Sequence, residues 1–215
     1  MEWVDNIKAN IGKQILANRM KSRKRSPVVC TIHEAQNIGI IYNATEYVSF
    51  EIIRELVKRL SHEGTRIMVL GYVHSKELID HYLYRKGFDF FSTNDLNWYF
   101  KPVSSVTEQF VSEPFDLLIN LSLQDYYPIH YITALSPATF KAGRFSPDDQ
   151  YLDFMIDIEK EKRNMNSVQQ EIMKDALKSD LDADIEADVN KKTETEMQLN
   201  FLINQLIHYL SILKK

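Results

Sequence analysis

Short apolar runs alternate with helix-length segments along the chain, and this alternation constrains the fold most strongly. The runs at 65–73 and 115–121 contain few polar side chains, which is typical of strands covered on both faces. An earlier run at 37–43 is rich in isoleucine, and the segment at 47–63 that follows it places its apolar residues on one helical face. Strands separated by helix-length connections predict a parallel sheet with right-handed crossovers.

The alternation extends over most of the chain and predicts one principal domain. We expect residues 26–158 to form an α/β fold, a doubly wound, mostly parallel Rossmann-like sheet, with added N- and C-terminal helices. The predicted strand order is 3-2-1-4-5 or a variant, so the order reverses between the strands at 37–43 and 115–121. Further strands are predicted at 88–91, 139–143 and 151–158, and further helices at 75–87, 105–112 and 129–135.

Charge divides the chain more sharply than its net charge of -4 suggests. Residues 1–25 hold seven basic and two acidic residues and are predicted to form an amphipathic basic helix, with Trp3 and Ile7 at four-residue spacing. The stretch 148–196 is strongly acidic, and residues 159–192 are predicted to be an acidic helical appendage. Thr193 and Glu196 fit a capping box, which predicts a last helix at 193–215 that packs on the domain or on a partner.

Polar side chains follow three of the predicted strands directly. In an open parallel sheet, ligands bind outside the carboxyl ends of the strands, near the point where the order reverses. These residues therefore predict a small-ligand pocket, in which His74 and Asp125 would be the acid–base candidates. The alternative is that the same residues cap helices and close turns. The candidates are Asn43, Thr45, Tyr72, His74, Asn120, Ser122, Gln124 and Asp125.

Several classes of site lack the motif they require. The first strand is followed by 43–49 without a glycine, so a dinucleotide fingerprint is missing, and the chain contains no P-loop and no G-x-S-x-G elbow. The six histidines show no zinc-binding spacing, and Cys30 lies in an apolar setting that predicts a buried, inert thiol. We therefore predict no metal, no cofactor and no catalytic residue.

Partners are predicted mainly for the terminal helices. No apolar run approaches the ~20 residues that span a bilayer, and acidic residues near Met1 argue against a secretory signal, which predicts a cytoplasmic protein. A pI near 5.9 argues against a nucleic-acid partner, and the contiguous aromatics at 98–100 are predicted to be packing residues. The basic run at 21–25 suits anionic lipid, nucleic acid, an acidic protein surface, or the acidic segment of a second copy. It could also complement its own helix dipole.

Two resemblances bear on the fold. The residues at 115–121 and 131–143 resemble the N-terminal half of heptosyltransferase-like glycosyltransferases, in which a similar strand precedes a helix, a small-residue turn and a strand ending in glycine. Those enzymes bind the nucleotide-sugar in a second Rossmann domain, for which this chain has no room, so the resemblance implies the fold and not transferase activity. Residues 27–158, with the closing helix at 205–210, also resemble a bacterial family of small Rossmann-like proteins without assigned function.

Three functions are consistent with these observations, and one of them is a peripheral membrane protein held at the bilayer surface by residues 1–25. The other two do not involve a membrane. The first is a non-catalytic cytoplasmic protein that binds a partner, or itself, through its terminal helices. The alternative is a protein or enzyme that uses the pocket at the strand ends for a nucleotide or a sugar phosphate.

Overall fold

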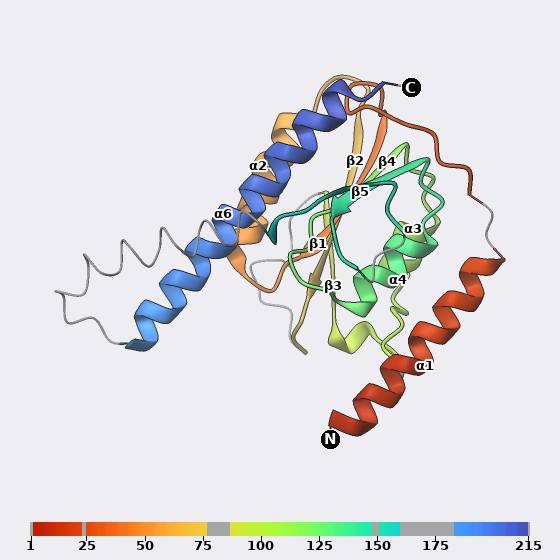
Figure 1. Cartoon of the computed structure of the whole chain (residues 1–215), viewed down its shortest axis with the longest axis vertical. Helices are drawn as coiled ribbons and strands as arrows, with labels where there is room; N and C mark the ends of the chain where they lie inside the picture. The colour runs from red at the N-terminus through yellow and green to blue at the C-terminus, as the bar shows by residue number, and fades with distance from the viewer. Residues whose placement is uncertain (1, 23–24, 77–86, 148–150, 160–182, 215) are drawn as a thin grey trace.

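The computed structural model describes residues 2–22, 25–76, 87–147, 151–159 and 183–214. They form a six-stranded, entirely parallel sheet in the order β3-β2-β1-β4-β5-β6, with helices on both faces (Figure 1). The strands are β1 (Asn37–Asn43), β2 (Arg66–Val73), β3 (Phe88–Ser92), β4 (Leu117–Asn120), β5 (Phe140–Arg144) and β6 (Phe154–Ile156). The helices are α1 (Glu2–Lys21), α2 (Tyr47–Leu60), α3 (Ser105–Ser112), α4 (Tyr127–Leu135) and α6 (Ala183–Ile212), with a 3-10 turn η2 (Thr93–Asp95).

The sheet confirms the predicted fold class and the predicted strand order. Ile40 of β1 pairs with Val69 of β2 on one side and with Ile119 of β4 on the other, so the order reverses at β1 and β4 as predicted. All three side chains are buried. Burial on both faces is the reason why the central strands are continuous apolar runs and not alternating ones. The predicted helix at 75–87 lies largely outside the described residues.

Each face of the sheet has its own apolar core. Ile38, Ile40 and Tyr42 belong to the core that α2 and α6 cover. Ile41 belongs to the core that α3 and α4 cover on the opposite face. Fully burying one large aliphatic side chain stabilises a fold by about 1.5–3 kcal/mol, so both layers contribute substantially to stability.

Helix α1 contacts the domain through its C-terminal half. Leu16 is 2 % exposed and packs with residues of α4. Arg19 Nη1 donates a hydrogen bond of 2.7 Å to the hydroxyl of Tyr131. Trp3 is 74 % exposed, and Ile7 is exposed too. The predicted apolar stripe of this helix is therefore used over only part of its length.

Helix α6 corrects one prediction. It runs without interruption from Ala183 to Ile212, so Thr193 lies inside a helix and does not begin one. A capping box stabilises a helix start because the first amide groups have no partner one turn earlier. Here the helical residues before Thr193 supply those partners, and the capping pattern has no such role. The rest of the predicted acidic appendage, at 160–182, lies outside the described residues.

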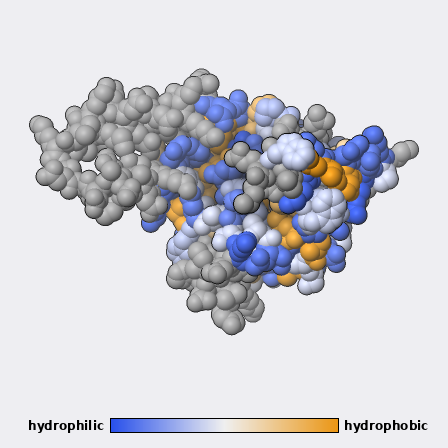
Figure 2. Space-filling model, turned by 90° about the horizontal axis from the view of Figure 1, so that it is seen from below, coloured by the Kyte–Doolittle hydropathy of each residue, from blue (hydrophilic) through white to orange (hydrophobic). Residues whose placement is uncertain are grey.

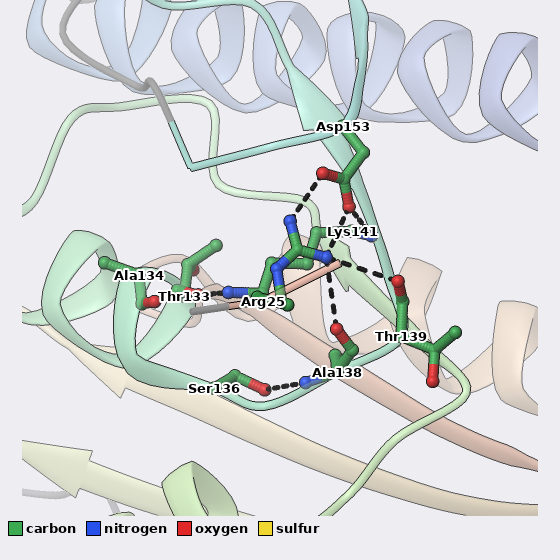
Figure 3. A network of polar contacts seen from close by, with 8 residues as sticks. All are labelled: Arg25, Thr133, Ala134, Ser136, Ala138, Thr139, Lys141 and Asp153. Carbon is green, nitrogen blue, oxygen red and sulfur yellow. Dashed lines mark hydrogen bonds and ion pairs between the residues drawn. The ribbon is translucent and has the colours of Figure 1, made fainter. Parts of the chain in front are cut away.

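A polar network ties the segment after α1 to the edge of the sheet (Figure 3). Arg25 makes a two-pronged ion pair with Asp153, with 2.7 Å between Nη1 and Oδ2. Asp153 Oδ2 also accepts a hydrogen bond from the backbone N–H of Lys141 in β5. The buried Lys141 ammonium group donates to the carbonyl oxygens of Thr133 and Ala134, at the C-terminal end of α4, where a cation is favoured. The network therefore joins the segment after α1 to α4, β5 and the residue before β6, which lie more than 100 residues later in the chain.

Candidate ligand pocket at the carboxyl edge of the sheet

A pocket of about 410 Å³ opens where the strands end, beside α1 and the loop that follows β3. Figure 2 looks onto this edge from below, and hydrophobic residues are exposed there among hydrophilic ones. The residues that line the pocket come from segments far apart in sequence and are mostly aromatic or apolar. They are Lys8, Tyr72, His74, Thr93, Leu96, Asn97, Trp98, Phe100, Asp125, Tyr126, Tyr127 and Pro128.

Three ring side chains form one wall of the pocket. Tyr72, near the end of β2, shares a hydrogen bond of 3.0 Å between its hydroxyl group and His74 Nδ1. The ring of Tyr126 lies edge-on to Tyr72 at 5.3 Å and tilted against His74 at 4.9 Å, measured between centroids. Burial, with a smaller contribution from Tyr126, raises the pKa of Tyr72 well above its ordinary value. Tyr72 therefore stays neutral at physiological pH.

The loop after η2 forms a second wall. Asn97 Oδ1 accepts hydrogen bonds from the backbone N–H groups of Tyr99 and Lys101, at 3.1 and 3.0 Å. Phe100 has a φ of 65°, a left-handed conformation that costs a residue other than glycine about 1–3 kcal/mol. This tight turn places Trp98 and Phe100 on the pocket, and Trp98 is 61 % exposed. The backbone strain is thus found at the pocket lining.

The polar end of the pocket is an ion-paired cluster. Asp125 Oδ1 pairs with Arg144 Nη2 and lies 3.4 Å from His130 Nε2. Arg144 Nε also donates a hydrogen bond of 3.2 Å to the carbonyl oxygen of Ser122. The Arg144 side chain is only 9 % exposed, so a largely buried positive charge stabilises the Asp125 carboxylate. The negative charge of Asp125 is therefore largely balanced.

The predicted residues gather at this edge but divide into two groups. Tyr72, His74 and Asp125 line the pocket. The others form a chain of hydrogen bonds that closes the turns after β1 and β4, as the alternative interpretation expected. After β1, the backbone N–H of His74 donates to Thr45 Oγ1 at 2.9 Å, and Thr45 Oγ1 donates to Asn43 Oδ1 at 2.6 Å. Asn43 Nδ2 then donates to Gln124 Oε1 at 2.8 Å, which joins the two turns. After β4, Ser122 Oγ donates to the Gln124 carbonyl oxygen at 2.7 Å, and the backbone N–H of Ser122 donates to Asn120 Oδ1 at 3.0 Å.

The crevice at the reversal point is consequently filled. Only about 10 Å³ remains between Asn43, Leu123 and the α6 residue Leu199. In an open doubly wound sheet a ligand would occupy this place. Here α6 covers it, and the open pocket lies to one side, between the ends of β2 and β4 and the loop at 96–100.

Sequence reasoning missed part of the lining. It also missed Arg144, which does not line the pocket but pairs with the lining residue Asp125. Arg144 is the last residue of β5, so the carboxyl-end rule applied to that strand would have found it. Trp98 and Phe100 were interpreted as packing, because three contiguous aromatics give no spacing signal. Lys8 lies 64 residues or more from every other lining residue in the chain, and no local pattern indicates that α1 reaches this edge.

A larger cavity of about 610 Å³ lies at the opposite edge, near the C-terminal ends of α3 and α4. Its two cationic side chains, Arg25 and Lys141, belong to the network that joins α1, α4 and the sheet. We assign this cavity a structural role and not a binding role.

The described residues restrict the chemistry further. Among them, no group of three or more His, Cys, Asp and Glu side chains is placed to hold a metal ion. No helix in the described part of the chain combines the length and the apolar character needed to cross a bilayer. Cys30 is buried, as the sequence predicted.

Comparisons with known proteins give a family and no function. Residues 8–174, well over half of the chain, match the model described as a family of unknown function (DUF6913). No curated protein and no solved structure matches the chain. The pocket must therefore be interpreted from its own geometry.

Proposed function

Because the chain belongs to the DUF6913 family of unknown function, which brings no activity with it, we propose a function from the pocket itself. The protein binds a small planar molecule that contains an aromatic or heteroaromatic ring, and it binds this molecule without transforming it. The observation that carries the proposal is the aromatic lining formed by Tyr72, His74, Trp98, Phe100 and Tyr126 around a 410 Å³ space.

Size and lining support this proposal. Pockets for small molecules typically have volumes of about 300–1,000 Å³ and combine apolar walls with a few placed polar groups. Offset or edge-to-face contacts between rings contribute about 0.5–1.5 kcal/mol beyond the burial of area. Tyr72, His74 and Tyr126 already contact one another in such arrangements. They are consequently held in place before a ligand arrives, which lowers the entropy cost of binding.

The acid–base candidates have structural partners, which supports binding rather than catalysis. His74 shares its Nδ1 with the Tyr72 hydroxyl group, and its backbone N–H is bound by Thr45. Asp125 is paired with the largely buried Arg144. A general base needs a free lone pair directed at the substrate. When the Tyr72 hydroxyl group donates to Nδ1 of His74, the other ring nitrogen carries the proton, and the Asp125 carboxylate is engaged by Arg144.

We expect the pocket to be detectable through the emission of Trp98. The chain has two tryptophans, so a Trp3→Phe variant leaves Trp98 as the single reporter. Titration with nucleosides, nucleotides and aromatic carboxylates should give saturable quenching with at least one compound. A ligand at about 100 times its Kd stabilises the fold by about 2.7 kcal/mol, which should raise the Tm by roughly 5–10 °C for a chain of this length.

The control locates the binding site. Tyr126→Ala should remove both the quenching and the shift in Tm, whereas Tyr47→Ala, which removes an exposed ring on α2, should leave both unchanged. The proposal is wrong if no planar compound alters either signal, or if the two variants behave alike.

A second candidate function is self-association through the terminal helices. Trp3 and Ile7 continue the apolar stripe of α1 beyond the part that packs on the domain, and both are exposed. The segments 1–25 and 148–196 carry opposite net charge, so contact between two copies could join them. A cytoplasmic location and a peripheral membrane contact through residues 1–25 remain predictions of the sequence.

Sedimentation equilibrium tests this second candidate. We expect the full chain to form dimers or larger assemblies at micromolar concentration, and a Trp3→Ser, Ile7→Ser variant to be monomeric with an unchanged Tm. A wild-type chain that stays monomeric at all concentrations tested would refute self-association. If that monomer then co-sedimented with anionic vesicles, the exposed face of α1 would be assigned to lipid instead.

A further inference from the structure

We propose that the pocket selects heteroaromatic rings whose edge carries hydrogen-bond acceptors, and that Asn97 and His74 are the two donors that recognise this edge. An acceptor in this sense is a ring nitrogen or a carbonyl oxygen attached to the ring. The inference rests on the proposed function, because it names the class of ligand for the same site. It assigns one oriented donor to each wall of the pocket.

The amide group of Asn97 is held so that its amino end is the open one. Oδ1 accepts hydrogen bonds from the backbone N–H groups of Tyr99 and Lys101, at 3.1 and 3.0 Å, so this end of the amide is the carbonyl. The Asn97 backbone N–H also donates to the Lys101 carbonyl oxygen at 2.9 Å, which closes the same turn. Within the described part of the chain, Nδ2 of Asn97 donates to no residue. Asn97 lines the pocket, so its amino group is available to a ligand.

The ring of His74 is held in one tautomer by Tyr72. Tyr72 is 1 % exposed, and among the described residues its hydroxyl group bonds only to His74 Nδ1. If the hydroxyl accepted this bond, its own hydrogen would be buried without a partner, which is costly. The hydroxyl therefore donates to Nδ1, and Nε2 carries the hydrogen of the imidazole. Nε2–H bonds to none of the described residues, so it is a second donor available to a ligand.

Other side chains of the lining shift the balance further toward donors. Trp98 is exposed at the pocket, and its indole nitrogen can only donate. The Asp125 carboxylate, which can only accept, is engaged by Arg144. The hydroxyl of Tyr127 is buried against α1, since a Cβ atom added at Gly12 would lie 3.0 Å from it. A ligand edge that presents acceptors is therefore satisfied better than an edge that presents N–H donors.

These donors decide between ligand classes that the aromatic walls alone would accept. Ring contacts and burial favour a hydrocarbon ring as well as a heteroaromatic one. A hydrocarbon ring that covered Asn97 Nδ2 and His74 Nε2 would remove their water without replacing its hydrogen bonds, and this loss weakens binding. A ring nitrogen or carbonyl oxygen replaces those bonds. Because the two donors stand on different walls, acceptors at two positions of the ring edge make use of both.

Quinoxaline and indole test the inference, because they are uncharged two-ring compounds with opposite edges. Quinoxaline has two ring nitrogens that accept hydrogen bonds, whereas indole has one N–H group that donates. We expect the full wild-type chain to bind quinoxaline about tenfold more tightly than indole, in titrations followed by ligand-observed NMR.

Asn97→Asp reverses the polarity of one wall. It keeps the oxygen that holds the turn and replaces the amino group by an acceptor. It should weaken quinoxaline about fivefold, as the loss of one neutral hydrogen bond predicts. It should also tighten the binding of indole and leave the Tm unchanged. Asn200→Asp is the matched control, because Asn200 is exposed on α6 and does not line this pocket. It adds the same charge and should change neither affinity.

The donor on the other wall is tested by the double variant Tyr72→Phe, His74→Phe. This variant keeps both rings and leaves no buried hydroxyl group unpaired. It should weaken quinoxaline about fivefold and leave the affinity for indole unchanged.

The outcomes separate this inference from the proposed function. If both compounds bind, Tyr126→Ala abolishes that binding, and Asn97→Asp shifts both affinities alike or neither, the role of the donors is refuted while the pocket stands. Equal affinity of the wild type for the two compounds leads to the same conclusion. If neither compound binds, but another planar compound quenches Trp98 in a manner that Tyr126→Ala removes, the inference fails alone. If no planar compound does so, the proposed function fails with it.

Discussion

Replacing Leu202 by alanine is expected to destabilise the fold by about 2–5 kcal/mol, which is the range for truncating a buried leucine. Leu202 is fully buried in the core that α6 shares with α2 and the sheet. Its removal leaves a cavity in a close-packed core, which the surrounding side chains fill only in part. Urea unfolding followed by circular dichroism would measure the loss directly.

Ile212→Ala is the matched control on the same helix, since Ile212 is 56 % exposed. A change of less than about 0.5 kcal/mol is expected there, as for most surface substitutions. If both variants lost the same small amount, α6 would not be part of the core. The comparison therefore tests whether the last helix belongs to the domain.

Gly143→Val is expected to cost about 3 kcal/mol, at the upper end of the range for overpacking. Gly143 in β5 pairs with Asn120 in β4. A Cβ atom added there would lie 2.7 Å from the Asn120 carbonyl oxygen and 2.9 Å from Leu152 Cδ1. The first of these atoms is backbone, so the strand itself has to move. Arg144, the next residue in β5, would be displaced together with the strand. Because Arg144 pairs with Asp125 at the pocket, ligand binding there should weaken as well.

Gly64→Asn is a substitution that changes the backbone preference at a glycine without crowding any neighbour. Gly64 has a φ of +88° with nothing within 4 Å of an added Cβ, and asparagine tolerates that region better than most residues. A loss of roughly 1 kcal/mol or less is expected. Thermal and urea unfolding would measure the loss of stability in Gly64→Asn and in Gly143→Val. A larger loss in Gly64→Asn would contradict the prediction that crowding at Gly143 is the more costly effect.

Much of the fold could be predicted because the sheet is buried on both faces. Burial imposes runs such as 65–73 and 115–121, and the connections between them are long enough for helices, which fixes parallel strands. The start of α6 was predicted wrongly. A capping pattern at Thr193 carries information about a helix end only when the preceding residues are not helical, and the local sequence does not show this.

The site was less predictable, because most of its lining comes from outside the strand ends. The carboxyl-end rule indicated Tyr72, His74 and Asp125, which line the pocket. It also indicated Asn43 and Asn120, whose side chains hold turns instead. The contributions of α1 and of the loop at 96–100 depend on tertiary packing, such as the close approach at Gly12. Such packing has no signature in periodicity or composition.

Helix α6 is one continuous helix whose C-terminal part is docked on the domain. Its first buried side chain, among those described, is Gln198, although the helix begins at Ala183. At a rise of about 1.5 Å per residue, the portion before Gln198 is about 22 Å long. A rotation of the docked half by about 5° would move the far end by roughly 2 Å over that length. A displacement near Ala183 is accordingly transmitted to Leu199 and Leu202, which are buried in the core between α6, α2 and the sheet.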